Sequence, residues 1–106
     1  MIPEITPTQL KQRLDQPEPL QLLDVREPQE WDICHLGGTL IPLTDLAKKA
    51  STLDSSLPTV VICHHGFRSA QAVLFLQQRF GFANVLNLKG GLHAWAKEAD
   101  PSFPTY

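Results

Sequence analysis

The segment from residue 58 to residue 81 constrains the fold more than any other part of the chain. Residues 59–63 are rich in β-branched side chains and follow a proline, which is typical of a buried strand. In residues 69–80 the apolar positions recur at helical spacing, and Gly81 then predicts the end of a helix. A strand, a short loop and a helix in this order indicate a parallel sheet, with Cys63 at the carboxyl end of a strand.

The remaining chain shows the same alternation of short apolar runs with amphipathic segments. Strands are predicted at 20–25, 39–41 and 85–88, and helices at 6–15 and 92–99. We therefore expect an α/β fold, with a central parallel sheet of about five short strands and helices on both faces. A chain of 106 residues, 42% of them hydrophobic, is long enough for one core. We expect a single domain over 1–106, with 99–106 as a C-terminal tail.

Composition excludes several classes of protein. The net charge of −2 lacks the basic excess expected of a nucleic-acid binder. No apolar run approaches the roughly 20 residues that span a bilayer, so no membrane segment is predicted. The first residues do not resemble a secretory signal, and two cysteines are too few for a disulfide framework. These observations predict a cytoplasmic protein.

The distribution of charge is more informative than its sum. There is no Asp or Glu between Ser55 and Lys97, whereas four basic residues and three histidines fall in that interval. This half of the chain suits an anionic ligand. The four basic residues are Arg68, Arg79, Lys89 and Lys97, of which Arg79 and Lys97 are interpreted as solvated surface charges.

Cys63 opens a loop that suits nucleophilic chemistry. The loop leads into a helix, and the unpaired N–H groups of a helix N-terminus stabilise a thiolate. Arg68 and any protonated histidine would add to this effect, and Gly66 permits a tight curve of the backbone. Alternatively, Cys63 is only the last apolar residue of a strand, because free cysteine is commonly buried. The spacing of Gly66, Arg68 and Ser69 after it favours a functional role.

The segment Cys63-His64-His65-Gly66-Phe67-Arg68-Ser69 resembles the active-site loop of the rhodanese family, Cys-x-x-Gly-x-Arg followed by Ser or a similar residue. Three further segments resemble family signatures and occur in the family's order. They are residues 22–31 (Leu-Leu-Asp-Val-Arg, then Glu, Glu and Trp), 35–42 (His-Leu-x-Gly, then Ile-Pro) and 90–95 (Gly-Gly-Leu-x-Ala-Trp). The similarity spans about residues 5–98.

The resemblance implies a sulfurtransferase. Cys63 would accept a sulfane sulfur from a small anionic donor such as thiosulfate, or from a protein persulfide, and pass it to a thiol, cyanide or a sulfur-carrier protein. It implies that Asp24 and Arg26 support the loop, and it implies no cofactor and no metal. The residues that would bind substrate are those of the loop: His64, His65, Gly66, Phe67, Arg68 and Ser69.

Two residues depart from the family pattern. His64 stands where the family often has Arg or Lys, so part of the attraction for an anion is expected to depend on pH near the usual histidine value of about 6.5, and the preferred donor stays open. Cys34 stands where the family usually has glycine and is interpreted as a small filler. It is expected near the sheet edge opposite Cys63, and the two should not pair.

The other histidines and the tryptophans receive structural interpretations. We expect His35 to be buried and to fix a turn, His93 to be solvated, and Trp31 and Trp95 to pack in or near the core. A zinc site is disfavoured, because its candidate ligands form adjacent pairs instead of pairs spaced by two to four residues. Those candidates are Cys34, His35, Cys63 and His64.

Two alternatives to a sulfurtransferase remain. A cysteine phosphatase or an arsenate reductase uses a related loop, but the phosphatase pattern has five residues between cysteine and arginine, and this chain has four between Cys63 and Arg68. Phosphate should therefore fit poorly. The second alternative is a rhodanese-like module that has lost its chemistry and serves in binding or regulation. Such modules usually lack the cysteine.

Overall fold

The computed structural model describes residues 2–104 and contains a five-stranded, all-parallel sheet. The order of strands across the sheet is β1-β5-β4-β2-β3, so the strand nearest the N-terminus pairs with the last one. The strands are β1 (Glu4–Ile5), β2 (Gln21–Asp24), β3 (Thr39–Leu40), β4 (Thr59–Ile62) and β5 (Val85–Leu88). The predicted α/β class with about five parallel strands is confirmed.

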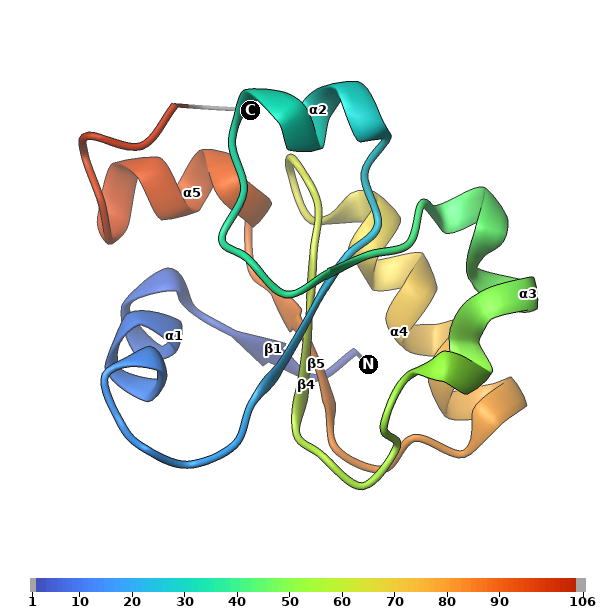
Figure 1. Ribbon diagram of the computed structural model, residues 1–106. Helices are drawn as coiled ribbons and strands as arrows, with labels where there is room; N and C mark the ends of the chain where they lie inside the picture. Colours follow the sequence, from blue (N-terminus) through green and yellow to red (C-terminus); the bar gives the residue numbers. More distant parts are fainter. Residues whose placement is uncertain (1, 105–106) are drawn as a thin grey trace.

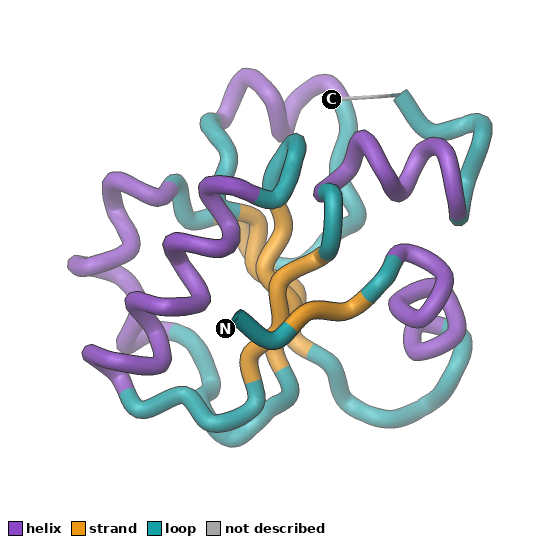
Figure 2. The backbone as a smooth tube through the Cα atoms, turned by 180° about the vertical axis from the view of Figure 1, so that it is seen from behind, coloured by secondary structure: helices purple, strands orange, loops and turns teal. Residues whose placement is uncertain are grey.

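Helices cover both faces of this sheet. α1 and α5 lie together on one face, and α3 and α4 lie on the other, while α2 sits beyond the carboxyl ends of the strands (Figures 1 and 2). The helices are α1 (Pro7–Leu14), α2 (Pro28–Ile33), α3 (Leu46–Lys49), α4 (Phe67–Phe80) and α5 (Gly91–Glu98). Two short 3₁₀ turns, Leu43–Asp45 and Ala50–Thr52, flank α3.

Local sequence explains where α1 begins and where α4 ends. At the start of α1, Gln9 N–H donates to the Thr6 hydroxyl at 3.1 Å, and Thr6 N–H donates to the Gln9 side chain at 2.9 Å. This reciprocal cap satisfies two N–H groups that the helix itself cannot. α4 ends at Gly81, whose φ of 66° is the left-handed conformation that favours glycine.

Two apolar clusters, one on each face, hold the helices to the sheet. One packs α3 and α4 against β2 and β4, and the other packs α1 and α5 against β4 and β5. All four residues of β4 are buried, as expected for a central parallel strand that is covered on both faces. The strand that ends at Cys63 is therefore fixed from both sides.

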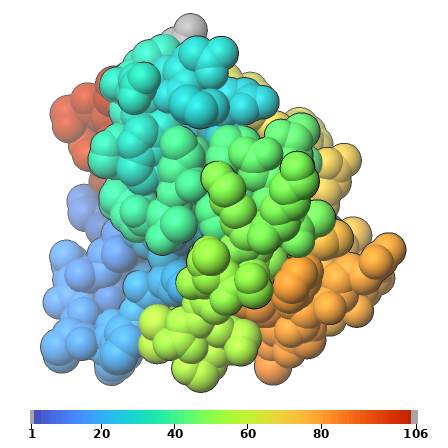
Figure 3. Space-filling model, turned by 45° about the vertical axis from the view of Figure 1, so that its right-hand side comes forward, coloured from blue at the N-terminus to red at the C-terminus, as the bar shows by residue number. Residues whose placement is uncertain are grey.

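The segment from β2 to α3 differs most from expectation. α2 was not predicted because none of its six residues is buried, and it therefore lacks an apolar face that periodicity could reveal. Figure 3 shows α2 and the segment that follows it covering the upper and middle part of one side of the molecule. β1 and α3 were missed because they have only two and four residues. Within residues 2–104, no helix is long and apolar enough to cross a membrane.

Candidate active site

The sulfur of Cys63 lies in a small cradle of main-chain donors. Gly66 N–H donates to Sγ at 3.0 Å and Ser69 N–H donates at 3.3 Å. Both donors belong to the start of α4, where N–H groups have no partner inside the helix. The Cys63 side chain is only 1% exposed, so little water screens these contacts. The cradle places hydrogen-bond donors where negative charge on sulfur would be stabilised.

Gly66 has the conformation that the loop needs to turn into α4. Its φ is 96°, and an added Cβ would lie 3.3 Å from the main-chain nitrogen of Gly90. A side chain at position 66 would therefore be strained by its backbone and crowded by its neighbour. The predicted role of Gly66 in a tight curve agrees with this geometry.

Asn87, on β5, is a site residue that the sequence analysis missed. Its amide oxygen accepts a short hydrogen bond from the Ser69 hydroxyl, and its Nδ2 donates to the Gly66 carbonyl at 3.2 Å. The Ser69 hydroxyl in turn lies 3.2 Å from Cys63 Sγ. Asn87 is 3% exposed and is a polar residue within an apolar strand, which is the signal that could have identified it.

The N-terminus of α5 holds the other side of the loop. Leu92 N–H donates to the Cys63 carbonyl at 2.9 Å, and His93 N–H donates to the His64 carbonyl at 3.0 Å. Gly91 packs so closely that a Cβ there would overlap both of these carbonyl oxygens. Consequently the main chain of residues 63 and 64 is fixed by a helix that begins almost thirty residues later.

Arg68 joins the loop to α2. Its guanidinium makes a bidentate ion pair with Glu30, at 2.7 and 2.9 Å. These hydrogen bonds hold the pKa of Glu30 at about 2, well below the ordinary value for a glutamate, although partial burial opposes the shift. Arg68 was predicted to orient the loop or an anion, and its ion pair with Glu30 is a contact that would serve the first of these roles.

Asp24 and Arg26 form a buried ion pair beneath α2. The Arg26 side chain is fully buried, and its Nε and Nη2 donate to the Asp24 carboxylate at 2.8 to 3.1 Å. Arg26 also donates to the carbonyl oxygens of Glu30 and Cys34. The pair was predicted to hold the Cys63 loop. These contacts join it to the main chain of α2 and Cys34, and Glu30 of α2 in turn binds Arg68 of the loop.

The expected positions of Cys34 and His35 were wrong. Cys34 follows α2, and Arg26 binds its carbonyl, so it lies at the carboxyl edge of β2 and not at the opposite edge. Both Cys34 and Cys63 are free thiols. His35 is exposed and not buried, but its Nδ1 accepts from Gly37 N–H at 3.0 Å and fixes a turn as predicted. Its ring stacks on half-buried Trp31.

Three histidine side chains gather beside the Cys63 loop: His64, His65 and His93. One ring nitrogen from each lies within 4.8 Å of the others. His93 was predicted to be solvated, but it is half-buried and its ring centre lies 5.0 Å from that of His65. Burial, followed by repulsion from His65, lowers the pKa of His64. In the described part of the chain, the groups close enough to share an ion do not include Cys34, His35 or Cys63.

The surface around the loop is uneven. Phe67, the first residue of α4, is 78% exposed and lies within the loop that was predicted to bind substrate.

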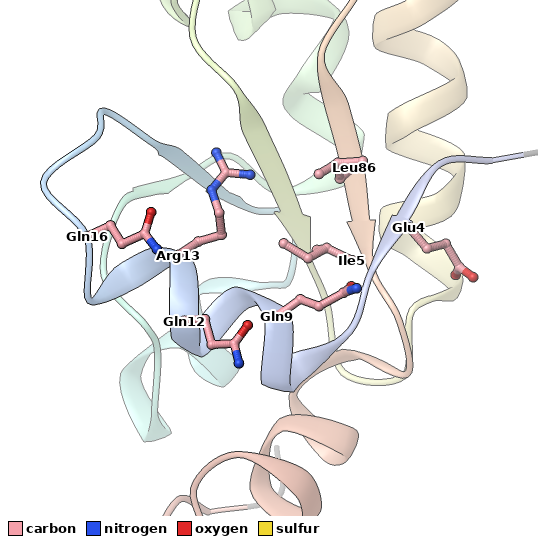
Figure 4. Close-up of a pocket in the computed structure, with 7 residues that line it drawn as sticks. All are labelled: Glu4, Ile5, Gln9, Gln12, Arg13, Gln16 and Leu86. Carbon is pink, nitrogen blue, oxygen red and sulfur yellow. The ribbon is translucent and has the colours of Figure 1, made fainter.

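A separate hollow lies between α1 and β5, where side-chain amides and Arg13 surround Ile5 and Leu86 (Figure 4). None of its lining residues belongs to the Cys63 loop. Trp95 is buried in the core, as predicted.

Comparison with known families places this geometry in context. A model described as rhodanese-like domain matches residues 6–98. The chain belongs to the rhodanese-like domain family. The match covers the cysteine loop and all three of the additional segments that resemble the family's signatures. The resemblance noted from the sequence is thus confirmed over most of the chain.

Curated relatives connect this rhodanese-like domain to sulfurtransferases. It is 39% identical over 105 residues to a probable adenylyltransferase/sulfurtransferase, MoeZ, of Mycobacterium tuberculosis, covering 96% of the chain and 26% of the relative. It is 36% identical over 100 residues to the putative sulfur carrier protein YrkF of Bacillus subtilis, covering 93% of the chain and 54% of the relative. The chain thus spans from a quarter to about half of the length of these relatives.

Solved rhodanese-like structures have the same fold. A rhodanese-related protein from Thermoplasma volcanium is 33% identical, with a TM-score of 0.81 and coverage of 96% of this chain and 95% of the other. The rhodanese-like domain of an Anabaena protein is 34% identical, with a TM-score of 0.80 and coverage of 100% and 80%. The strand order and the position of the loop therefore belong to an established architecture.

Proposed function

We propose that this rhodanese-like domain is a sulfurtransferase that carries sulfane sulfur as a persulfide on Cys63. The observation that carries the proposal is the cradle of Gly66 and Ser69 N–H groups around Cys63 Sγ. A buried nucleophilic sulfur needs such donors because its negative charge cannot be stabilised by bulk water. Kinship with named sulfurtransferases supports the same activity.

The first half-reaction loads the cysteine. The Cys63 thiolate attacks the outer sulfur of thiosulfate, an S–S bond forms, and the bond between the two thiosulfate sulfurs breaks. The electron pair of that bond leaves with sulfite. One negative charge stays on the outer sulfur of the new persulfide, and the donors of the loop stabilise it there.

The second half-reaction returns the free enzyme. A thiolate or cyanide attacks the outer sulfur, and the electron pair of the persulfide bond returns to Cys63 Sγ. The Gly66 and Ser69 N–H groups then stabilise the regenerated thiolate. The Ser69 hydroxyl lies 3.2 Å from Sγ and close to Asn87, so it is placed to adjust its hydrogen bond as the charge on sulfur changes.

A protein is the acceptor, or the persulfide donor, that fits the surroundings of the loop best. Phe67, the first residue of α4 after the Cys63 loop turns, exposes an apolar ring, and aromatic side chains are enriched in protein interfaces. The proposal includes a reducing compartment such as the cytoplasm, in which both cysteines stay free and thiol acceptors are abundant. The single-domain organisation over 1–106 is part of the same proposal.

The direct test is intact-mass measurement after incubation with thiosulfate. The expected result is a gain of one sulfur, about 32 mass units, that disappears on addition of cyanide. Cys63→Ser should gain nothing, and Cys34→Ser should gain the sulfur as the unmodified protein does. Transfer that depends on Cys34 instead would contradict the assignment of Cys63.

Failure with both thiosulfate and persulfide donors would refute the sulfurtransferase and favour a non-catalytic binding module. A phosphatase would instead release phosphate from a phosphate ester such as p-nitrophenyl phosphate. The ion pair between Arg68 and Glu30 disfavours that outcome, because the guanidinium is already bound by a carboxylate.

A further inference from the structure

We propose that His64, His65 and His93 form a binding site for one divalent ion of the zinc class. From the sequence, a zinc site was weighed only for Cys34, His35, Cys63 and His64 and was disfavoured by their adjacent spacing; the set of His64, His65 and His93 was not considered. The fold brings them together: His64 and His65 follow Cys63 in the loop, and His93 comes from the first turn of α5. The ligand atoms of all three lie within 4.8 Å of one another.

The size of this cluster suits a single ion. Zn–N bonds are about 2.0 to 2.1 Å, so two nitrogens on one tetrahedral ion lie about 3.3 Å apart. Side-chain rotations that move the nitrogens by about 1.5 Å would close the site from the arrangement observed here. His65 is exposed and can rotate at little cost, while half-buried His64 and His93 supply the fixed part of the site.

A main-chain hydrogen bond already holds the backbones of His64 and His93 next to each other. His93 N–H donates to the His64 carbonyl at 3.0 Å, and Gly91 packs directly against that carbonyl, so the two segments are in main-chain contact. A metal site gains affinity when its ligands do not have to be ordered by the ion. The ring centres of His64 and His65 lie 4.1 Å apart, and those of His64 and His93 lie 6.2 Å apart.

Three neutral imidazoles are the donor set of open zinc sites, in which a fourth position remains for water or another ligand. Imidazole nitrogen also binds Cu²⁺ and Ni²⁺, whereas Mg²⁺ and Ca²⁺ prefer oxygen. The ligand is thus a divalent cation that prefers nitrogen donors, such as Zn²⁺. Two of its three ligands, His64 and His65, belong to the Cys63 loop itself.

The experiment is calorimetric titration with Zn²⁺ of tag-free protein carrying Cys34→Ser and Cys63→Ser, so that thiolates cannot bind the metal. One ion per chain should bind. His93→Gln in the same background should weaken binding at least about tenfold, because even the loss of a residue that only orients a ligand typically costs 10- to 100-fold. His65→Gln should do the same and, since His65 is exposed, should leave the fold intact.

The matched control is His35→Gln, which removes an exposed histidine outside the cluster and should leave zinc affinity unchanged. Circular dichroism and thermal melting establish that each variant is folded. Absence of stoichiometric binding in the parent would overturn the site. Equal affinities of the His93, His65 and His35 variants would overturn it as well. The cysteine-free background makes this test independent of whether the chain transfers sulfur.

Discussion

Replacing Gly91 by alanine should damage both stability and sulfur transfer, because the methyl group would collide with the main chain of the cysteine loop. The Cβ would overlap the carbonyl oxygens of Cys63 and His64. Neither atom belongs to a flexible side chain, so the loop or the start of α5 must move. Gly81 offers a matched control: its φ is 66° against 65° for Gly91, but a Cβ there meets nothing within 4 Å.

The expected loss in free energy of unfolding has two parts: the backbone strain that both variants share, and the steric overlap that only Gly91→Ala has. An alanine in the left-handed region costs about 1–2 kcal/mol, and the reduced entropy of the unfolded chain offsets about 0.4–1 kcal/mol of this. Gly81→Ala should therefore destabilise by between about 0 and 1.6 kcal/mol. Gly91→Ala carries the same strain plus an overpacking penalty of about 1–3 kcal/mol, for a total of roughly 1–5 kcal/mol.

Urea unfolding of both variants measures the free energies of unfolding, and the release of thiocyanate from thiosulfate and cyanide measures transfer. A displacement of the loop by about 1 Å should lower transfer by about a hundredfold in Gly91→Ala, while Gly81→Ala retains the original rate. If Gly91→Ala is as stable and as active as Gly81→Ala, the close approach of Gly91 does not fix the Cys63 loop.

Two other substitutions test contacts behind the loop. Glu30→Gln should destabilise the fold by about 1 kcal/mol, a value discounted because its ion pair with Arg68 is partly exposed. Since the folded pKa of Glu30 is about 2, this contribution is complete above the unfolded value of about 4.3 and is lost as the pH falls through about 2. The difference in urea stability between wild type and variant should therefore shrink from pH 6 to pH 2, and a constant difference would contradict the assignment. Asn87→Ala should cost about 1–3 kcal/mol and slow transfer, because it removes the hydrogen bonds that Asn87 makes with the buried Ser69 hydroxyl and the Gly66 carbonyl. Asn84→Ala, at an exposed position, is the control, and equal melting temperatures would refute the role of Asn87.

The sequence predicted the elements that bury apolar surface. β4 and α4 were predicted because their apolar residues follow strand and helix periods, and both pack against the core. α2 has no buried residue, so its sequence carries no such pattern. Without α2, the chain after β2 was expected to cross the sheet at once. That expectation put Cys34 at the wrong edge.

The candidate site was likewise predicted only in part, because sequence patterns reveal local contacts and not distant ones. Cys63, Gly66 and Ser69 are neighbours in sequence, and their roles follow from one loop that enters one helix. Glu30 and Asn87 reach the loop from other elements, and sequence spacing does not reveal which distant side chain will face it. The histidine cluster was missed for this reason also, since it depends on α5 beginning beside the loop.

The strand order has a consequence for how the protein is made. In the sheet β1 pairs with β5 alone, so the first strand of this domain to be translated finds its partner only after about eighty further residues have been synthesised. The backbone donors that hold Cys63 and His64 are translated later still. Such non-local pairing slows folding. A nascent chain that has exposed Cys63 but not α5 therefore lacks the main-chain donors that fix the loop, and under the proposed function sulfur loading would follow translation of α5.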